Sequence, residues 1–139
     1  MVMRQTQADR RQAERAGRFA EIAALAWLCC TGHRLLARRY KAAGGEIDLV
    51  VRRGKVIIFC EVKYRRPASH NASHNASHDG MPTPTQQRRI CSAAREFVAR
   101  RHISPDFECR FDLIRISPFS WRDGLPVRHL RDAWWCDPG

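Results

Sequence analysis

Two apolar strands joined by a tight turn stand at the centre of this sequence, in residues 45–63, GEIDLVVRRGKVIIFCEVK. β-branched and aromatic residues dominate both halves, as is typical of buried strands. Arg53-Gly54 between them predicts a two-residue hairpin loop in which Arg52 faces Lys55. Acidic residues inside such apolar strands are unusual, and they carry the functional interpretation.

The predicted turn decides which residues of the two strands face each other. With Arg52 opposite Lys55, Glu46 lies opposite Glu61 and Asp48 opposite Phe59. Because side chains alternate across a sheet, one face then collects Glu46, Asp48, Glu61 and Lys63. Three carboxylates so placed repel one another unless a cation joins them, and oxygen-rich clusters suit Mg²⁺ or Mn²⁺. The alternative is a set of exposed ion pairs with Arg52 and Lys63.

The other segments predict an α-β-β-β-α-β-β order. Residues 10–30 form the first helix, with apolar residues at helical spacing in Phe19, Ile22, Ala23, Ala26 and Trp27. Strands follow around 35–40, 46–51, 56–63, 108–116 and 127–130, and a second helix over 86–101 has Ile90, Ala94, Phe97 and Val98 on one face. A chain of 139 residues with 44% hydrophobic content fits one domain over 1–139.

Residues 68–79 repeat the unit Ala-Ser-His-Asn/Asp three times. Such a segment cannot offset its ordering entropy by burial, so a flexible inserted loop is expected over about 66–84. The spacing of His70, His74 and His78 would suit zinc on a helix, but replication slippage explains the repeat more simply.

The formal net charge of +11 would attract phosphate backbones or anionic membrane surfaces. No stretch approaches the roughly 20 apolar residues of a membrane span, so nucleic acid is the expected partner and a membrane is not. Base-rich coding could equally explain why arginine supplies all but three of the 25 basic residues. The six cysteines contain no C-x-x-C, which favours reduced, buried thiols in a cytoplasmic protein.

The sequence leaves open the roles of Glu21 and of the four tryptophans. Glu21 is the only charged residue between Phe19 and Cys30, and a buried carboxylate needs a partner, either a metal, a lysine or an arginine. The four tryptophans could stack on unpaired bases. Core packing is expected for Trp27, and neither role is favoured for Trp134 and Trp135.

Several sequence blocks resemble a known family. Residues 45–50 and 59–65, together with the Ala16–Glu21, Gln87–Ile90 and Arg110–Leu113 segments, are similar to the YraN family of small bacterial proteins. That family is placed in the PD-(D/E)XK nuclease superfamily, related to Holliday-junction resolvases. The resemblance covers most of the chain, and an ordered set of blocks is far more specific than an isolated E-x-K.

The resemblance implies a restriction-endonuclease-like αβββαβ core, with a mixed sheet flanked by helices. It implies that Asp48 and Glu61 bind a divalent cation, with the Val62 carbonyl as a further ligand and Glu46 as an additional candidate. Lys63 would orient or deprotonate the attacking water, and Glu21 would join from the first helix. The candidate nucleic-acid contacts are Arg65, Arg66, Gln87, Arg88 and Arg89. Gln86 replaces a usual lysine, which puts its role in doubt.

Two hypotheses follow. The first is a Mg²⁺- or Mn²⁺-dependent endonuclease acting on DNA, with branched or single-stranded substrates expected and RNA less favoured. The second is a non-catalytic nucleic-acid-binding accessory protein on the same scaffold, whose binding would be sensitive to salt and indifferent to metal. A homodimer is expected by analogy alone.

Overall fold

A computed structural model describes residues 6–65, 80–117 and 126–137 of the chain. Its elements are α1 (Gln7–Cys30), β1 (Arg34–Ala42), β2 (Gly45–Arg53), β3 (Val56–Tyr64), α2 (Pro84–Arg100), β4 (Glu108–Ile116) and β5 (Val127–Trp134). The predicted element order and the αβββαβ core are confirmed. The histidine repeat, most of the expected inserted loop, Arg66 and Trp121 lie outside the described residues.

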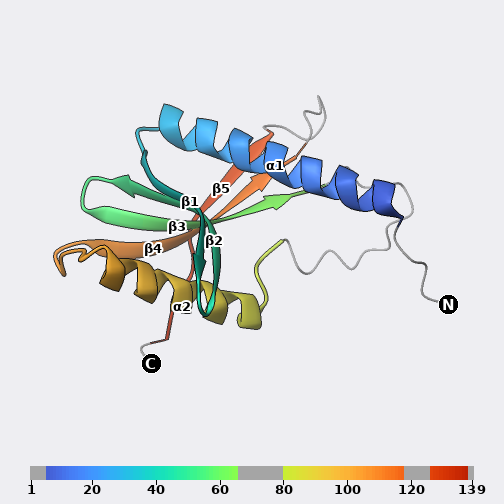
Figure 1. Cartoon of the computed structure of the whole chain (residues 1–139). Coiled ribbons are helices and arrows are strands. Elements are labelled where there is room, and N and C mark those ends of the chain that lie inside the picture. The colour runs from blue at the N-terminus through green and yellow to red at the C-terminus, as the bar shows by residue number, and fades with distance from the viewer. Residues whose placement is uncertain (1–5, 66–79, 118–125, 138–139) are drawn as a thin grey trace.

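The five strands form one mixed sheet in the order β1-β2-β3-β4-β5. The β3–β4 pair is parallel and the other three pairs are antiparallel. Helix α2 lies in the crossover between the two parallel strands, as such a connection requires. Figure 1 shows α1 over one face of the sheet and α2 over the other.

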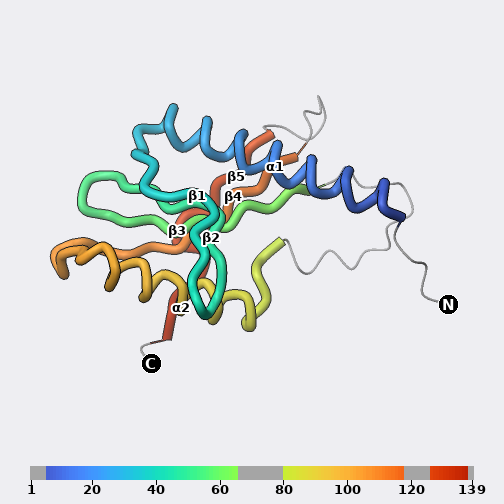
Figure 2. Tube along the Cα trace, in the orientation of Figure 1, coloured from blue at the N-terminus to red at the C-terminus, as the bar shows by residue number. Residues whose placement is uncertain are grey.

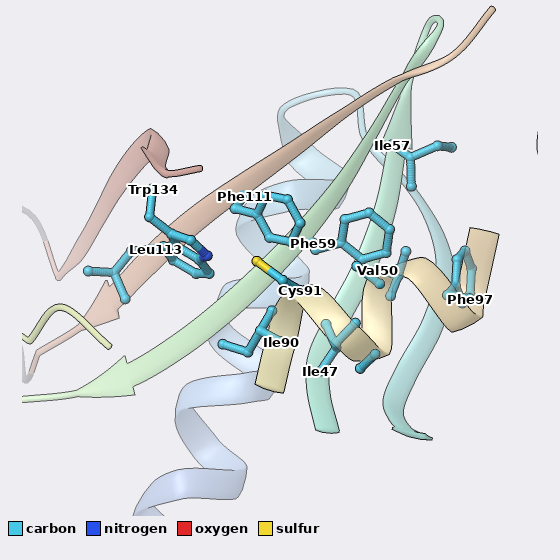
Figure 3. Packing of buried hydrophobic residues seen from close by; sticks show 12 residues of the cluster. Ile47, Val50, Ile57, Phe59, Ile90, Cys91, Phe97, Phe111, Leu113 and Trp134 are labelled. Carbon is cyan, nitrogen blue, oxygen red and sulfur yellow. The ribbon is translucent and has the colours of Figure 1, made fainter. Parts of the chain in front are cut away.

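Each face of the sheet has its own apolar core. On the α2 face an aromatic row runs from Phe97 through Phe59 and Phe111 to Trp134, with neighbouring ring centroids 5.8, 5.3 and 5.6 Å apart (Figure 3). On the α1 face Leu28 packs with aliphatic residues of β2, β3 and β4. Burial on both faces explains why the central strands are almost continuously apolar.

Helix α1 meets the sheet through small residues. Its buried residues are Ala20, Ala24 and Leu28, whereas Phe19 and Ile22 are 62% and 57% exposed. The spacing therefore indicates the helix correctly, but two of its large apolar residues do not belong to the core. Alanine side chains let the helix axis approach the sheet closely, which a face built on Phe19 would prevent.

The β2–β3 hairpin turns one residue later than the sequence suggests. Arg53 pairs with Val56, so the loop is Gly54-Lys55 and not Arg53-Gly54. Gly54 has a φ of 59°, which glycine adopts without steric cost at the first position of such a turn. Pairing shifts by two residues, so the side chains of the paired residues keep their predicted faces. Continuing from Leu49–Cys60, Asp48 is level with Glu61, which corrects its predicted pairing with Phe59.

The expectation of reduced, buried cysteines is wrong for most of them. Cys91 of α2 and Cys136, which follows β5, form a disulfide. Three further cysteines have exposed positions, and Cys60 is the buried free thiol among the described residues. The two cysteines are far apart in the sequence and become neighbours only in the fold, so their spacing in the sequence does not indicate the disulfide. In the described ranges, no helix has the length and apolarity needed to cross a membrane.

Candidate functional site

The candidate site lies where the β2–β3 ladder ends. The last paired residues are Leu49 and Cys60. Beyond them, the Val62 amide donates to Asp48 Oδ2 at 2.8 Å, so a carboxylate replaces the next main-chain acceptor. In an antiparallel ladder the N–H and C=O of one residue point to the same side. The Val62 carbonyl therefore faces the same open end as the Asp48 carboxylate.

Two neighbouring irregularities accompany Asp48. Ile47 and Val50 both belong to the α2-side core, although strict alternation would put them on opposite faces. On β1, Arg39 lies between the paired residues Arg38 and Tyr40 and has a φ of 46°, a left-handed conformation that is costly for arginine. The strands thus bend where the carboxylate is placed.

Asp48 and Glu61 form the centre of the site. Their carboxyl groups lie close together, and burial together with the neighbouring Glu61 charge raises the pKa of Asp48 to about 7. Glu61 Oε1 also contacts Lys63 Nζ at 3.1 Å. Glu61 and Lys63 are two residues apart on one strand and hence on one face, as predicted. Arg52 instead donates from Nε to the Gly54 carbonyl and lies over the Phe107 ring, so the alternative of ion pairs between hairpin acids and Arg52 is not observed in the described residues.

A cavity of about 310 Å³ opens onto these carboxylates. It is lined by Gly45, Glu46, Asp48, Glu61, Gln86, Arg89 and Ile90. Its walls come from β2, β3 and the first turns of α2, and Figure 2 shows the β1–β2 turn reaching α2. Glycine permits that approach, because a Cβ on Gly45 would lie 2.6 Å from the Arg89 carbonyl oxygen. The turn therefore sets the depth of the cavity.

The oxygen donors of the site fit a hard divalent cation, but with fewer carboxylates than the sequence predicts. Glu46 lines the cavity but is exposed, and within the described ranges no three acidic, histidine or cysteine side chains are grouped closely enough to hold a metal. The expected trio of carboxylates is thus not assembled. Two carboxylates and the Val62 carbonyl remain, all oxygen donors, and Mg²⁺ commonly uses one or two carboxylates with water or phosphate completing its shell.

Glu21 approaches the site from α1 and is paired with an arginine, one of the alternatives left open. Arg39 Nε donates to Glu21 Oε2 at 2.8 Å. This hydrogen bond, with contributions from Glu46 and Asp48, raises the pKa of Arg39. Arg39 is thus a cation beside the acidic cavity, which sequence reasoning missed. The left-handed backbone of Arg39 depends on how β1 pairs with β2, so the residues around Arg39 in the sequence do not indicate it.

The predicted nucleic-acid residues divide between two sides of α2. Arg89 lines the carboxylate cavity, while Gln87 and Arg88 line a second cavity on the other flank of the helix. Gln86, where a lysine was expected, accepts from the Thr83 amide and completes a capping box at the start of α2. Arg65 is exposed at the end of β3.

A further basic residue near the site was not anticipated. Arg115 is the ladder partner of Lys63 on β4 and is only 6% exposed. A Cβ on Gly80 would lie 3.4 Å from its Nε, so the segment before α2 packs on this arginine. Arg115 therefore lies beside Lys63 in the sheet, and Lys63 in turn contacts Glu61. The period-two pattern of β4 indicates the strand, but only the parallel pairing with β3 reveals the neighbour.

A second acidic residue, Asp112 of β4, is fully buried in a different setting. Arg110 Nε and Nη2 donate to its two oxygens at 2.8 Å each, and the Asp132 amide donates at 3.0 Å. His129 Nε2 lies 2.7 Å from Asp112 Oδ2, while its Nδ1 accepts from Trp27 Nε1 at 3.4 Å. Burial alone would raise the pKa of Asp112, but the hydrogen bonds from His129 and Arg110 outweigh it and lower the pKa to about 2. Asp112 thus forms an ion pair with Arg110 inside the fold.

Comparison with known proteins gives a consistent result. The uncharacterised protein family UPF0102 matches residues 20–116. A UPF0102 protein of Maricaulis maris is 42% identical over 125 residues, covering 90% of this chain and 89% of its own length. A UPF0102 protein of Rhodopseudomonas palustris is 40% identical over 130 residues, covering 94% and 87%. One from Caulobacter vibrioides is 39% identical over 122 residues, covering 88% of each chain.

Proposed function

The chain belongs to UPF0102, the YraN-like family that its motifs indicate, and from this premise we propose that it is a divalent-metal-dependent endonuclease. Its substrate is DNA and its reaction is hydrolysis of a phosphodiester bond, on the pattern of the PD-(D/E)XK nucleases. One observation carries the proposal. Asp48 and Glu61 meet at the open end of a strand ladder, and Lys63 lies 3.1 Å from Glu61.

Each residue of the site would have a separate role. Asp48, Glu61 and the Val62 carbonyl would hold a Mg²⁺ or Mn²⁺ ion, which would supply Lewis-acid polarisation of the phosphate and of water. The Lys63 ammonium would donate to a phosphate oxygen and stabilise charge that develops there. Arg89 lies on the same cavity and is exposed, so it can hold the DNA backbone without reading sequence. Arg39 keeps Glu21 engaged beside the site.

The cleavage test uses purified protein with labelled single-stranded, duplex, flapped and four-way DNA, and with RNA. We expect Mg²⁺- or Mn²⁺-dependent cutting of DNA that Asp48→Ala abolishes and that Lys63→Ala lowers by a factor of about 100 or more. Lys55→Ala and Asp106→Ala are matched controls, since both residues are exposed and lie in turns away from the cavity. Cutting that survives Asp48→Ala would contradict the assignment.

A second function has one observation in its favour. Lys63 and Glu61 neutralise each other in the structure, so the site is partly satisfied without a metal. An accessory protein that only binds nucleic acid would keep this pair, and its affinity would depend on salt and not on metal or on Glu61→Ala. Wild-type protein that binds the substrates above with such behaviour and cuts none of them, with either metal, would favour this function.

A further inference from the structure

The second cavity at α2 has no role in the site described above. It has a volume of about 340 Å³ and lies between the first turns of α2 and the segment that follows β5. Its walls include Arg88 and Arg95 of α2 and Trp135 of the C-terminal segment. The carboxylate cavity is lined by different residues of the same helix turns. The two cavities therefore flank one helix, roughly 10 Å across.

The chemistry of this cavity is that of an aromatic platform beside positive charge. The side chain of Trp135 is 79% exposed, whereas its neighbour Trp134 is 6% exposed and packs in the core. The Trp135 indole does not hang free, since its Nε1 donates to Asp132 Oδ1 at 3.0 Å. Arg88 and Arg95 are both exposed. An oriented, solvent-facing indole that lines the same cavity as two arginines is suited to stacking a flat ring that carries phosphates.

Covalent and polar contacts hold the platform against α2. The disulfide from Cys91 to Cys136 fixes the residue next to Trp135 on the helix. Arg95 Nη2 also donates to the Asp137 carbonyl at 2.6 Å. Both sulfur atoms belong to residues that line the cavity. The cavity would lose one wall if the C-terminal segment moved away, so its shape depends on the disulfide.

We propose that Trp135 stacks on an unpaired base of single-stranded nucleic acid, that Arg88 and Arg95 contact the flanking phosphates, and that the Cys91–Cys136 disulfide keeps this site formed. A base inside a duplex cannot present its face to an indole, which selects single strands or the unpaired arm of a branched substrate. This inference rests on the proposed function for the nature of the polymer.

The binding test measures fluorescence anisotropy of a labelled oligo-dT and of a duplex of equal length, with EDTA present so that nothing is cut. Trp135→Ala should weaken single-strand binding roughly 5- to 100-fold and leave duplex binding nearly unchanged. Trp135→Phe should keep most of the affinity, which separates stacking from misfolding. Arg95→Ala should weaken single-strand binding more than Arg100→Ala, a matched control from the far end of α2 that pairs with Glu96. Equal single-strand affinity of wild type and Trp135→Ala overturns the proposal.

The role of the disulfide is tested in the same assay. Reduction with dithiothreitol breaks the sulfur–sulfur bond, gives one thiol on each cysteine and leaves the reagent as its cyclic disulfide. Reduced wild type and Cys136→Ser should lose single-strand affinity to the level of Trp135→Ala, and reduction should not weaken Trp135→Ala further. Identical affinity before and after reduction overturns the role given to the disulfide.

Failure here is distinguishable from failure of the proposed function. Asp48→Ala tests the carboxylate cavity through cleavage, whereas Trp135→Ala tests the second cavity through oligo-dT binding. A protein that never cuts but shows Trp135-dependent binding supports the stacking site alone. A protein that cuts DNA equally well with and without Trp135, and binds oligo-dT equally in both forms, supports the nuclease alone.

Discussion

Asp48 and Asp112 are both strand aspartates held inside one sheet, and their surroundings act in opposite directions. Asp112 accepts four hydrogen bonds, from Arg110, His129 and the Asp132 amide, and its pKa falls to about 2. Asp48 accepts one from the Val62 amide and faces Glu61, and its pKa rises to about 7. Internal donors complete the Asp112 carboxylate, whereas Asp48 has a single main-chain donor and an acidic neighbour. The difference separates a structural acid from a candidate ligand.

The largest expected effect concerns stability at pH 7 without metal. Asp112→Ala should lower the free energy of unfolding by about 3–5 kcal/mol, because Arg110 and the Asp132 amide lose their buried partner. Asp48→Ala should change it by about 1 kcal/mol or less, since one hydrogen bond is lost and an unfavourable buried charge disappears with it. Urea unfolding measures both, with the exposed Asp106→Ala as control. Equal losses of unfolding free energy in the two variants would show that the two aspartates do not differ in their contribution to stability.

The pH dependence of stability should have opposite signs at the two residues. The folded-state pKa of Asp48, about 7, lies above its ordinary value of 3.8, so the folded protein holds a proton that the unfolded chain releases. Stability then falls as pH rises from about 4 to about 7, by roughly 1–3 kcal/mol. Asp112, with a folded-state pKa of about 2, contributes stability that is present above about 4 and lost as pH falls toward 2.

Substitution separates these two contributions. Asp48→Asn should remove the decrease between pH 4 and 7, and wild type should become less stable relative to this variant as pH rises through that window. Thermal unfolding in EDTA at a series of pH values provides the measurement. Parallel stability curves for wild type and Asp48→Asn would show that Asp48 is solvated in solution and that its burial next to Glu61 carries no such energetic consequence.

The smallest expected effect is stabilisation by metal. Mn²⁺ at ten times its dissociation constant should add about 1.4 kcal/mol to wild type and nothing to Asp48→Ala. At a fixed Mn²⁺ concentration the gain should be larger at pH 8 than at pH 6, because the ion competes with the proton on Asp48. Asp112→Asn should keep the metal effect, since that residue is already completed by protein donors. Equal stabilisation of Asp48→Ala would place the ion elsewhere, the histidine repeat being the next candidate.

Local sequence signals were sufficient for the helices and strands. Apolar runs predicted β2, β3 and β4, and Thr83 with Gln86 formed the cap that starts α2. Asp48, Glu61 and Lys63 were identified as one group because an error of two residues in the register does not move paired side chains to the other face. The assumption of unbroken alternation was too simple. The backbone bends at Arg39 and Asp48, and Glu46 therefore stays exposed at the rim of the cavity.

Side-chain chemistry and periodicity, both local in the chain, determined the order of elements, the acidic pair with its lysine and the strongly basic character of the protein. Contacts between residues distant in sequence decided the rest: Arg39 on Glu21, Arg115 beside Lys63, Asp112 with His129, and the disulfide from Cys91 to Cys136. Such contacts depend on how α1, α2 and β5 pack on the sheet, and packing is a property of the whole chain. For this reason the two flanks of α2, and the second cavity with Trp135, emerge only in the tertiary structure.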